Sequence, residues 1–423
     1  MDIESSEFVK KYLRWIPISI LIGILAGLAV GTLMFLLDWA TETHEKHPSI
    51  VWFLPLVGFF IGWAYLTFGK DASGGNNLLI DEIHDPKKIL PLRMFPLILF
   101  GTVLTHLFGG SAGREGAAVQ MGATLSDRIS KFIKMEWGER KILLVAGAGA
   151  AFGGVLNAPI AGIIFGMEVI VIGRLKLFAI IECAIASFTA HTVVVFLNGP
   201  HIEYPRFEIP GFNFKIAFYI ALAGIIFGLT SRFFLFLTHF IEHTLVKFIS
   251  YNPLRPFIGG IILVLIYQLE GTFQYRGLGI AGIVKGLTVP QGFNLPALKT
   301  LLTSITIGSG FKGGEFVPLL FIGTTLGNAL SIIIPVSFKL LAAVGFVGVI
   351  SGASHTPIAC SIVAMEIFGI EIAPYAIIAC FMSYYFSGQI GMFKTQRLDE
   401  KRHHLPSKVL DWLGELPERF IKK

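Results

Sequence analysis

The sequence predicts an all-α protein that crosses a membrane many times, and three observations lead to this prediction. First, 54% of the 423 residues are hydrophobic and only 15% are charged, whereas a soluble domain carries about 25% charged residues. Second, the chain contains continuous apolar runs of about 20 residues, the length of a helix that spans a bilayer. Third, 47 glycines interrupt the remaining apolar stretches, as in transporters whose broken helices line an ion site.

These numbers exclude several classes of protein. A water-soluble enzyme needs more charge on its surface, and a disordered chain does not carry 38 phenylalanines. The net charge of +6 therefore reflects Lys and Arg on the cytoplasmic side, and we expect no binding of nucleic acid. The three cysteines show no paired spacing, so neither a disulfide framework, a metal site nor a cofactor is predicted.

The first two membrane spans are predicted at residues 16–37 and 50–68, which are continuous apolar runs. Residues 1–15 precede them as a polar cytoplasmic segment, and no cleavable signal is expected because the first run lacks a small-residue cleavage site. Residues 394–423 follow the last span as a cytoplasmic tail with room for only a short amphipathic helix. Lys and Arg near both ends place both termini in the cytoplasm, which requires an even number of crossings.

The two halves of the transmembrane transport domain, residues 16–393, resemble each other. The segment Pro159-Ile160-Ala161 recurs as Pro357-Ile358-Ala359, and upstream of it Gly113 recurs as Gly314. Such a duplication is typical of transporters, whose substrate site lies where the repeats meet. The two repeats are expected at about 16–197 and 212–393.

Three glycine-rich segments stand directly before apolar helical runs. The first amides of a helix have no partners within the helix, and the macrodipole adds about half a positive charge there. Several such helix starts aimed at one point bind an anion without lysine or arginine. The alternative is that these glycines only allow close helix packing. The segments are Gly74-Gly75-Asn76-Asn77 before Leu78, Gly113-Arg114-Glu115-Gly116 before Ala117, and Gly313-Gly314-Glu315-Phe316-Val317 before Pro318, the expected first residue of its helix.

Glu115 is the strongest single candidate because a carboxylate at membrane depth is costly and functional by default. Its charge is attracted to the same amides that attract an anion, so we expect it to compete with the anion. It would swing away when an anion displaces it or when it takes a proton. One side chain would then gate the pathway and carry the proton. The alternative is a static helix cap or an ion pair with Arg114.

These motifs, with Asn157-Ala158-Pro159-Ile160-Ala161 between them, resemble the CLC family of anion channels and anion/proton antiporters. The likeness runs from about residue 15 to 400. It implies a homodimer of all-helical subunits in the lipid bilayer, each an inverted repeat of broken, tilted helices with its own anion pathway. It also implies that Glu115 is the gating glutamate, and that Gly314-Glu315-Phe316-Val317-Pro318 is the second anion-coordinating helix start.

Four departures from the family's pattern point to one branch. The serine-bearing first motif of the family is replaced by Gly74-Gly75-Asn76-Asn77-Leu78, and the customary proline after Gly116 is Ala117. The inner proton glutamate of the chloride/proton antiporters aligns with Val169, and the late pore tyrosine aligns with Phe393. The first three departures, with Glu315 in the second motif, resemble the bacterial fluoride/proton antiporters.

The resemblance therefore implies a transporter of the inner cell membrane, not an enzyme, that exports fluoride in exchange for protons. The amides of Asn76 and Asn77 would then repay more of the dehydration of fluoride than a serine hydroxyl does. Glu315 is expected either to replace the lost proton station or to pair with Lys312, and the first option is preferred because an antiporter needs an inner proton path. A chloride/proton antiporter and a passive anion channel remain alternatives.

Overall fold

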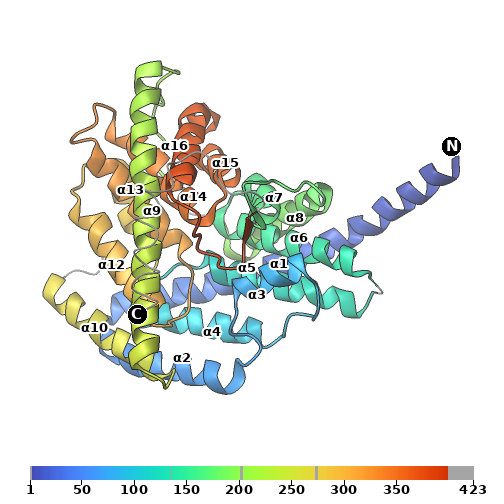
Figure 1. The fold of residues 1–423 in the computed structure, drawn as a ribbon, viewed down its shortest axis with the longest axis horizontal. Helices are drawn as coiled ribbons and strands as arrows, with labels where there is room; N and C mark the ends of the chain where they lie inside the picture. The colour runs from blue at the N-terminus through green and yellow to red at the C-terminus, as the bar shows by residue number, and fades with distance from the viewer. Residues whose placement is uncertain (1, 134, 201–202, 272–274, 399–423) are drawn as a thin grey trace.

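The computed structural model describes residues 2–133, 135–200, 203–271 and 275–398, with side chains from residue 13 onward. In these ranges the chain forms sixteen α-helices and a single pair of two-residue strands (Figure 1). The prediction of an all-α fold is thus confirmed. The helix expected in the tail 394–423 falls almost entirely outside the described residues.

The first repeat comprises eight helices. They are α1 (Asp2–Lys46), α2 (Leu54–Phe68), α3 (Asn76–His84), α4 (Met94–Leu107), α5 (Glu115–Asp127), α6 (Trp137–Leu156), α7 (Pro159–Glu168) and α8 (Ile180–Asn198). Two short 3-10 helices, η1 (Pro48–Phe53) and η2 (Arg128–Lys131), precede α2 and follow α5. Helix α1 extends beyond the apolar run in both directions, and its N-terminal end projects from the body of the molecule (Figure 1).

The second repeat has the same order of helices, each about 200 positions after its counterpart. They are α9 (Phe214–Phe248), α10 (Leu254–Glu270), α11 (Ile280–Thr288), α12 (Asn294–Gly308), α13 (Phe316–Leu330), α14 (Phe338–Ser354), α15 (Pro357–Phe368) and α16 (Ala373–Phe386), with the 3-10 helix η3 (Ile370–Ile372) before α16. The correspondence of α3 with α11 is close, since both have nine residues and begin after a glycine with a positive φ angle.

Long and short apolar helices alternate with loops in both repeats. In the described part of the chain, four helical stretches are long and apolar enough to cross a membrane, and six further apolar helices have only 10–17 residues. Short helices of this kind arise where a span is broken inside the protein. The long stretches are Leu13–Lys46, Pro48–Phe68, Ile180–Asn198 and Phe214–Phe248.

Several contacts between the repeats occur in reciprocal pairs. Gly113 and Gly314 form an antiparallel bridge in which each amide donates to the carbonyl oxygen of the other at 2.6 Å. Glu168, at the end of α7, accepts bonds of 2.9 and 2.7 Å from the first amides of α15. Glu366 on α15 accepts bonds of 2.9 and 2.8 Å from the first amides of α7. The repeats therefore pack in opposite directions, as an inverted repeat requires.

The turns before α7 and α15 also match. Asn157 and His355, at φ angles of 60° and 58°, are the only non-glycine residues with positive φ in the described ranges. Asparagine adopts this left-handed conformation readily and other non-glycine residues rarely do. The left-handed conformation recurs at equivalent positions, so the turn that it forms before α7 and before α15 belongs to the repeated fold.

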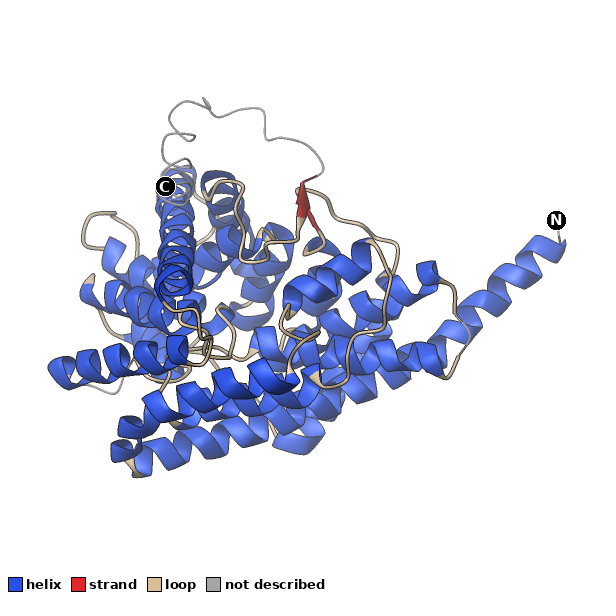
Figure 2. Cartoon of the chain, turned by 60° about the horizontal axis from the view of Figure 1, so that its bottom comes forward, coloured by secondary structure: helices blue, strands red, loops and turns tan. Residues whose placement is uncertain are grey.

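The chain that follows α16 returns to the first repeat. Strand β1 (Val171–Ile172) pairs in parallel with β2 (Arg397–Leu398) (Figure 2). The Thr395 hydroxyl donates to the carbonyl oxygen of Asn77 at 2.9 Å, and the side-chain amide of Gln396 donates to that of Val169 at 2.8 Å. These hydrogen bonds hold Thr395 and Gln396 next to the first repeat, with Thr395 beside the start of α3.

Candidate functional site

The three glycine-rich segments begin their helices earlier than the sequence analysis expected. Helices α3, α5 and α13 start at Asn76, Glu115 and Phe316, two residues before the predicted first residues in each case. Pro318 is therefore the third residue of α13 and not the first. A proline is tolerated throughout the first turn because the amides there have no partner within the helix. As a result, Asn76 and Glu115 lie within the first helical turns.

The structure brings the three helix starts together at Gly116. The Gly113–Gly314 bridge joins the start of α5 to that of α13. A Cβ atom at position 116 would lie 3.3 Å from the Cα atom of Gly314 and 3.3 Å from the side-chain nitrogen of Asn76. Because any side chain there would crowd both neighbours, the absence of a side chain at Gly116 lets α3, α5 and α13 meet.

Glu115 lies inside this convergence, and its side chain is 1% exposed. Its Oε2 atom accepts hydrogen bonds from the backbone amides of Val317 at 3.2 Å and Arg114 at 3.3 Å. Its Oε1 atom has no hydrogen-bond partner and lies 3.8 Å from Nε of Arg114. The ion pair with Arg114 is thus present but long. The carboxylate at the start of α5 thus accepts a hydrogen bond from an amide at the start of α13, where an anion would also bind.

The start of α3 contributes side chains whose polar atoms are unused. Gly75, with φ 54°, precedes α3, and a Cβ there would lie 3.3 Å from the side-chain nitrogen of Gln120 on α5. The carbonyl oxygen of Gly74 accepts a bond from the amide of Asn77 at 3.1 Å. The Oδ1 atoms of Asn76 and Asn77 are buried without a hydrogen-bond partner. These oxygens are hydrogen-bond acceptors, so an anion would bind the side-chain nitrogens of the same residues and not these atoms.

Glu315 precedes the first residue of α13, and its side chain makes no capping hydrogen bond. Its Oε2 atom is buried without a partner. The alternative pairing with Lys312 is not formed, because Nζ of Lys312 lies over the ring of Tyr65, 4.1 Å from its centroid. The charges that act on Glu315 belong to Glu242 and Lys394. These two half-exposed side chains pair at 2.8 Å, so Glu315 is adjacent to a surface ion pair.

Phe316 and Val317 are buried at the start of α13. The ring of Phe316 lies edge-on to those of Phe152 and Phe165, at centroid distances of 5.0 and 6.5 Å, and the latter two stack at 3.7 Å. The sequence analysis missed Phe152 as part of the site, although Phe165 follows the motif at Asn157. Three rings therefore form an apolar wall behind the helix starts.

Phe393 is 8% exposed and lies in the segment that returns to α3. The neighbouring amide of Met392 donates to the carbonyl oxygen of Ala353 at 2.8 Å, which places this segment against α14. Phe393 has no hydroxyl, so it cannot donate a hydrogen bond to an anion. In the described part of the chain, no group of three or more His, Cys, Asp or Glu residues could hold a metal ion.

Comparisons with known proteins agree with the resemblance seen in the motifs. The family model described as voltage gated chloride channel matches residues 57–388. A "Chloride/fluoride channel protein" of Pseudomonas syringae pv. tomato is 42% identical over 409 residues, which cover 95% of this chain and 90% of that protein. An H(+)/Cl(-) exchange transporter of Vibrio cholerae is 30% identical over 357 residues, covering 77% and 74% of the two chains.

The similarity extends to solved structures. The crystal structure of a CLC-type fluoride/proton antiporter matches 92% of this chain and 98% of its own, with a TM-score of 0.88 and 31% sequence identity. A slow cyanobacterial Cl-/H+ antiporter shares the fold, with a TM-score of 0.76 at 19% identity. Together with the inverted repeat and the three helix starts, these matches show that the chain belongs to the voltage-gated chloride channel (CLC) family.

Proposed function

We propose that the protein is a secondary active transporter that exports fluoride in exchange for protons. The observation that carries this proposal is the hydrogen bond from the Val317 amide to the Glu115 carboxylate at 3.2 Å. An anion and this carboxylate compete for the same donor at a helix start. Protonation removes the negative charge of Glu115 and weakens its hold on that amide. Anion movement and proton movement are thereby linked through one side chain.

The exchange follows from this competition. Ionised Glu115 occupies the amides at the start of α13 and blocks the pathway. Fluoride that arrives from the cytoplasm displaces the carboxylate, which swings out and takes a proton from the external side. The neutral side chain then carries that proton inward while fluoride leaves. Because the carboxylate must alternate between the two partners, neither ion crosses alone.

The start of α3 supports fluoride as the anion. Fluoride is smaller than chloride and accepts stronger hydrogen bonds, so it loses more on dehydration and gains more from close donors. The side-chain nitrogen of Asn76 supplies such a donor beside Gly116, and Asn77 follows it in the first turn of α3. The similarity to a relative named a chloride/fluoride channel protein and to a fluoride/proton antiporter supports the same choice.

Glu315 is the inner proton site in this proposal. The position at which the chloride/proton antiporters carry their inner glutamate is Val169, whose side chain cannot titrate. Glu315 is half-buried, and its Oε2 atom is buried without a hydrogen-bond partner. The proposed entry for the proton is the side of α9 and of the segment after α16, where Glu242 and Lys394 form a half-exposed ion pair.

The transporter functions as a homodimer that spans the inner membrane several times, with both termini in the cytoplasm. Family membership supports the membrane location, and apolar side chains exposed on the helices support contact with lipid or a second subunit. The Lys and Arg at both ends of the chain support the orientation. The proposed partners are thus the bilayer, a second copy, fluoride or chloride, and protons.

The test is ion flux from liposomes that contain the purified protein. Vesicles loaded with fluoride or with chloride are diluted into anion-free buffer while one electrode follows the anion and another follows external pH. We expect fluoride to leave much faster than chloride, with protons moving in the opposite direction. Faster chloride efflux with proton uptake would indicate a chloride/proton antiporter, and fluoride efflux without proton movement would indicate a passive channel. Either result contradicts the proposal.

A further inference from the structure

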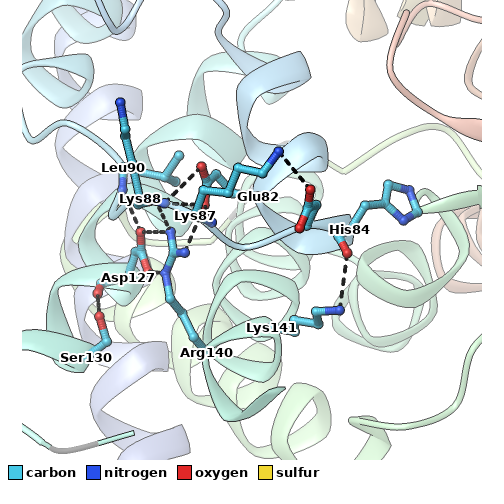
Figure 3. A network of polar contacts seen from close by, with 10 residues as sticks. Glu82, His84, Lys87, Lys88, Leu90, Asp127, Ser130, Arg140 and Lys141 are labelled. Atoms are coloured by element: carbon cyan, nitrogen blue, oxygen red, sulfur yellow. Dashed lines mark hydrogen bonds and ion pairs between the residues drawn. The ribbon is translucent and has the colours of Figure 1, made fainter. Parts of the chain in front are cut away.

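A buried network of charges lies where α3 and α5 end, away from the helix starts (Figure 3). The guanidinium of Arg140 on α6 donates to both oxygens of Asp127 at 2.6 and 2.8 Å and to Glu82 at 2.8 Å. The side chains of Arg140 and Asp127 are 2% and 0% exposed. Figure 3 shows the three side chains pointing toward one another from three different helices. The network therefore joins α3, α5 and α6 at one point.

The same residues hold the loop between α3 and α4. Glu82 accepts hydrogen bonds from the amides of Lys87 at 2.9 Å and Lys88 at 3.0 Å. Asp127 accepts one from the amide of Leu90 at 2.7 Å, and Arg140 donates to the carbonyl oxygen of Lys88 at 2.5 Å. A buried network in which every member is bonded makes the surrounding structure rigid. Helix α3, which has only nine residues, is thus held firmly at its end.

The second repeat makes the equivalent connection with one neutral residue. Asn328 on α13 corresponds to Asp127 on α5, and its side chain donates to the carbonyl oxygens of Gly286 and Val289 at 2.5 and 2.9 Å. It accepts a bond from the amide of Gln291 at 2.7 Å, as Asp127 does from Leu90. Helix α14 begins with Phe338-Lys339-Leu340-Leu341 and carries no arginine there. An asparagine is therefore enough to hold a short helix against a long one in this fold.

The two short helices differ in what they carry at their starts. Helix α3 begins with Asn76, whose amide lies against Gly116, whereas α11 begins with the apolar Ile280. Six residues separate Asn76 from Glu82, a distance of about 9 Å along the helix axis. A helix this short moves as a rigid rod, so a displacement at Glu82 reaches Asn76 undiminished.

We infer that Arg140 is a positioning residue for the anion site. By binding Glu82 and Asp127 together, it fixes Asn76 and Asn77 relative to Glu115, which stands at the other end of the helix that carries Asp127. A binding site must hold its donors within about 0.5 Å of the productive geometry. Fluoride depends on this more than chloride because its hydrogen bonds are shorter. The inference rests on the proposed function only in taking fluoride as the anion.

The experiment compares Arg140→Lys with the wild type in the liposome assay, with fluoride and chloride concentrations varied. Lysine keeps the positive charge, but it lacks the planar fork that binds two carboxylates and a carbonyl oxygen at once. We expect the KM for fluoride to rise about tenfold, as when remote residues misplace a bound group. The KM for chloride should change less, so that the preference for fluoride shrinks. The ratio of fluoride to protons should stay at the wild-type value, because Glu115 is intact.

The matched control is Asn328→Ala, which removes the equivalent connection in the second repeat, that of α11, a helix whose start carries no side-chain amide. Its KM for fluoride should equal that of the wild type. If Arg140→Lys does not fold, Glu82→Gln takes its place, since it keeps the shape and the bonds to the loop but removes one charge. The same rise in KM is expected for it.

Three results would overturn the inference. The first is a folded Arg140→Lys or Glu82→Gln protein with the wild-type KM and anion preference. The second is a loss of maximal rate in proportion to unfolded protein with no change in KM, which is the mark of a purely structural role. The third is an equal rise in KM for Asn328→Ala. The wild-type measurements judge the proposed function separately: if chloride is the preferred anion, the KM for chloride becomes the quantity that Arg140→Lys must raise.

Discussion

The two repeats share the contacts that hold the fold together but not the residues at the site. The Gly113–Gly314 bridge and the caps made by Glu168 and Glu366 are the same in both directions. By contrast, the residue that corresponds to Glu115 in the second repeat is Phe316. Residues that are equivalent in the two repeats therefore make structural contacts, whereas the proposed transport residue Glu115 has no equivalent in the second repeat.

The surroundings of the two short helices show the same difference. Lys299 on α12 is fully buried and donates to the carbonyl oxygens of Tyr275 and Gly277, just before α11, at 3.0 Å each. Its Nζ atom lies 5.3 Å from the ring centroid of Phe321. This lysine and this ring crowd Gly279, at the start of α11. In the first repeat the start of α3 carries Asn76 and Asn77, whose Oδ1 atoms have no hydrogen-bond partner. The two helix starts therefore differ in their neighbours: a lysine and an aromatic ring at α11, and the polar side chain of Gln120 at α3.

The largest effect is expected from neutralising Glu115, the residue that distinguishes the first repeat from the second. We expect Glu115→Gln to abolish coupled proton movement, because the amide resembles the protonated acid and cannot release a proton. The measurement is proton uptake by fluoride-loaded liposomes on release of the anion gradient. Glu366→Gln is the matched control, since it makes the same substitution at a half-buried residue that accepts bonds from the first amides of α7, and it should retain coupling. Undiminished proton uptake by Glu115→Gln would refute the assignment.

Neutralising Glu315 tests the carboxylate directly before α13, where the equivalent residue of the first repeat is Arg114. Glutamine keeps the size and the hydrogen-bonding capacity of Glu315 but cannot take up or release a proton. We expect Glu315→Gln to bind fluoride but to move protons at least about tenfold more slowly. A side chain positioned for proton transfer typically contributes a factor of about 100 or more to the rate. A folded mutant that exchanges fluoride for protons at the wild-type ratio would remove Glu315 from the proton path.

Replacing the first residues of α3 and α11 in parallel sharpens the comparison of the short helices. Asn76→Ala removes one donor to a charged ligand, which is worth about 1.5 kcal/mol or roughly a factor of ten. We therefore expect the ratio of fluoride to chloride flux to fall by about this factor. Ile280→Ala should leave the ratio unchanged. Equal effects of the two substitutions would show that the helix starts do not differ in function.

The smallest effects are expected at the reciprocal caps. Glu168→Gln and Glu366→Gln each remove a negative charge from a helix N-terminus, which costs about 1 kcal/mol. Because the two contacts have the same geometry, both variants should unfold at similarly lowered temperatures in detergent. Thermal unfolding followed by loss of the folded species provides the measurement. A large change for only one variant would mean that one of these residues has an additional role.

Much of the fold could be predicted from the sequence because membrane helices leave strong local signals. The apolar runs 16–37 and 50–68 lie within α1 and within η1 and α2, and the recurring motifs identified the repeat. The helix starts were misplaced by two residues. Asparagine and glycine are typical of loops at the starts of α3 and α5, and Pro318 was taken as the first residue of α13 although Phe316 and Val317 precede it in the helix. Local sequence cannot reveal where tertiary contacts override the intrinsic preference of a residue for a loop or a helix.

The contacts of the site were less accessible to sequence reasoning. That the Glu115 carboxylate accepts a bond from Val317 depends on the meeting of segments 202 positions apart, which no local pattern encodes. The network of Arg140, Asp127 and Glu82 was missed for the same reason. A signal was nevertheless present, because charged residues are scarce in this chain and those flanking apolar helices need partners.

The Gly113–Gly314 bridge has a consequence for the transport cycle. Many secondary transporters alternate access by rocking one repeat against the other around a fixed site. Here two hydrogen bonds of 2.6 Å cross between the repeats at the site itself, so rocking would break them at every turnover. Access in the proposed exchange must then alternate through rotation of side chains, which takes nanoseconds when they are free to move and not the microseconds to milliseconds of domain motion. The turnover rate would be set by ion binding and proton transfer, with the backbone acting as a fixed frame.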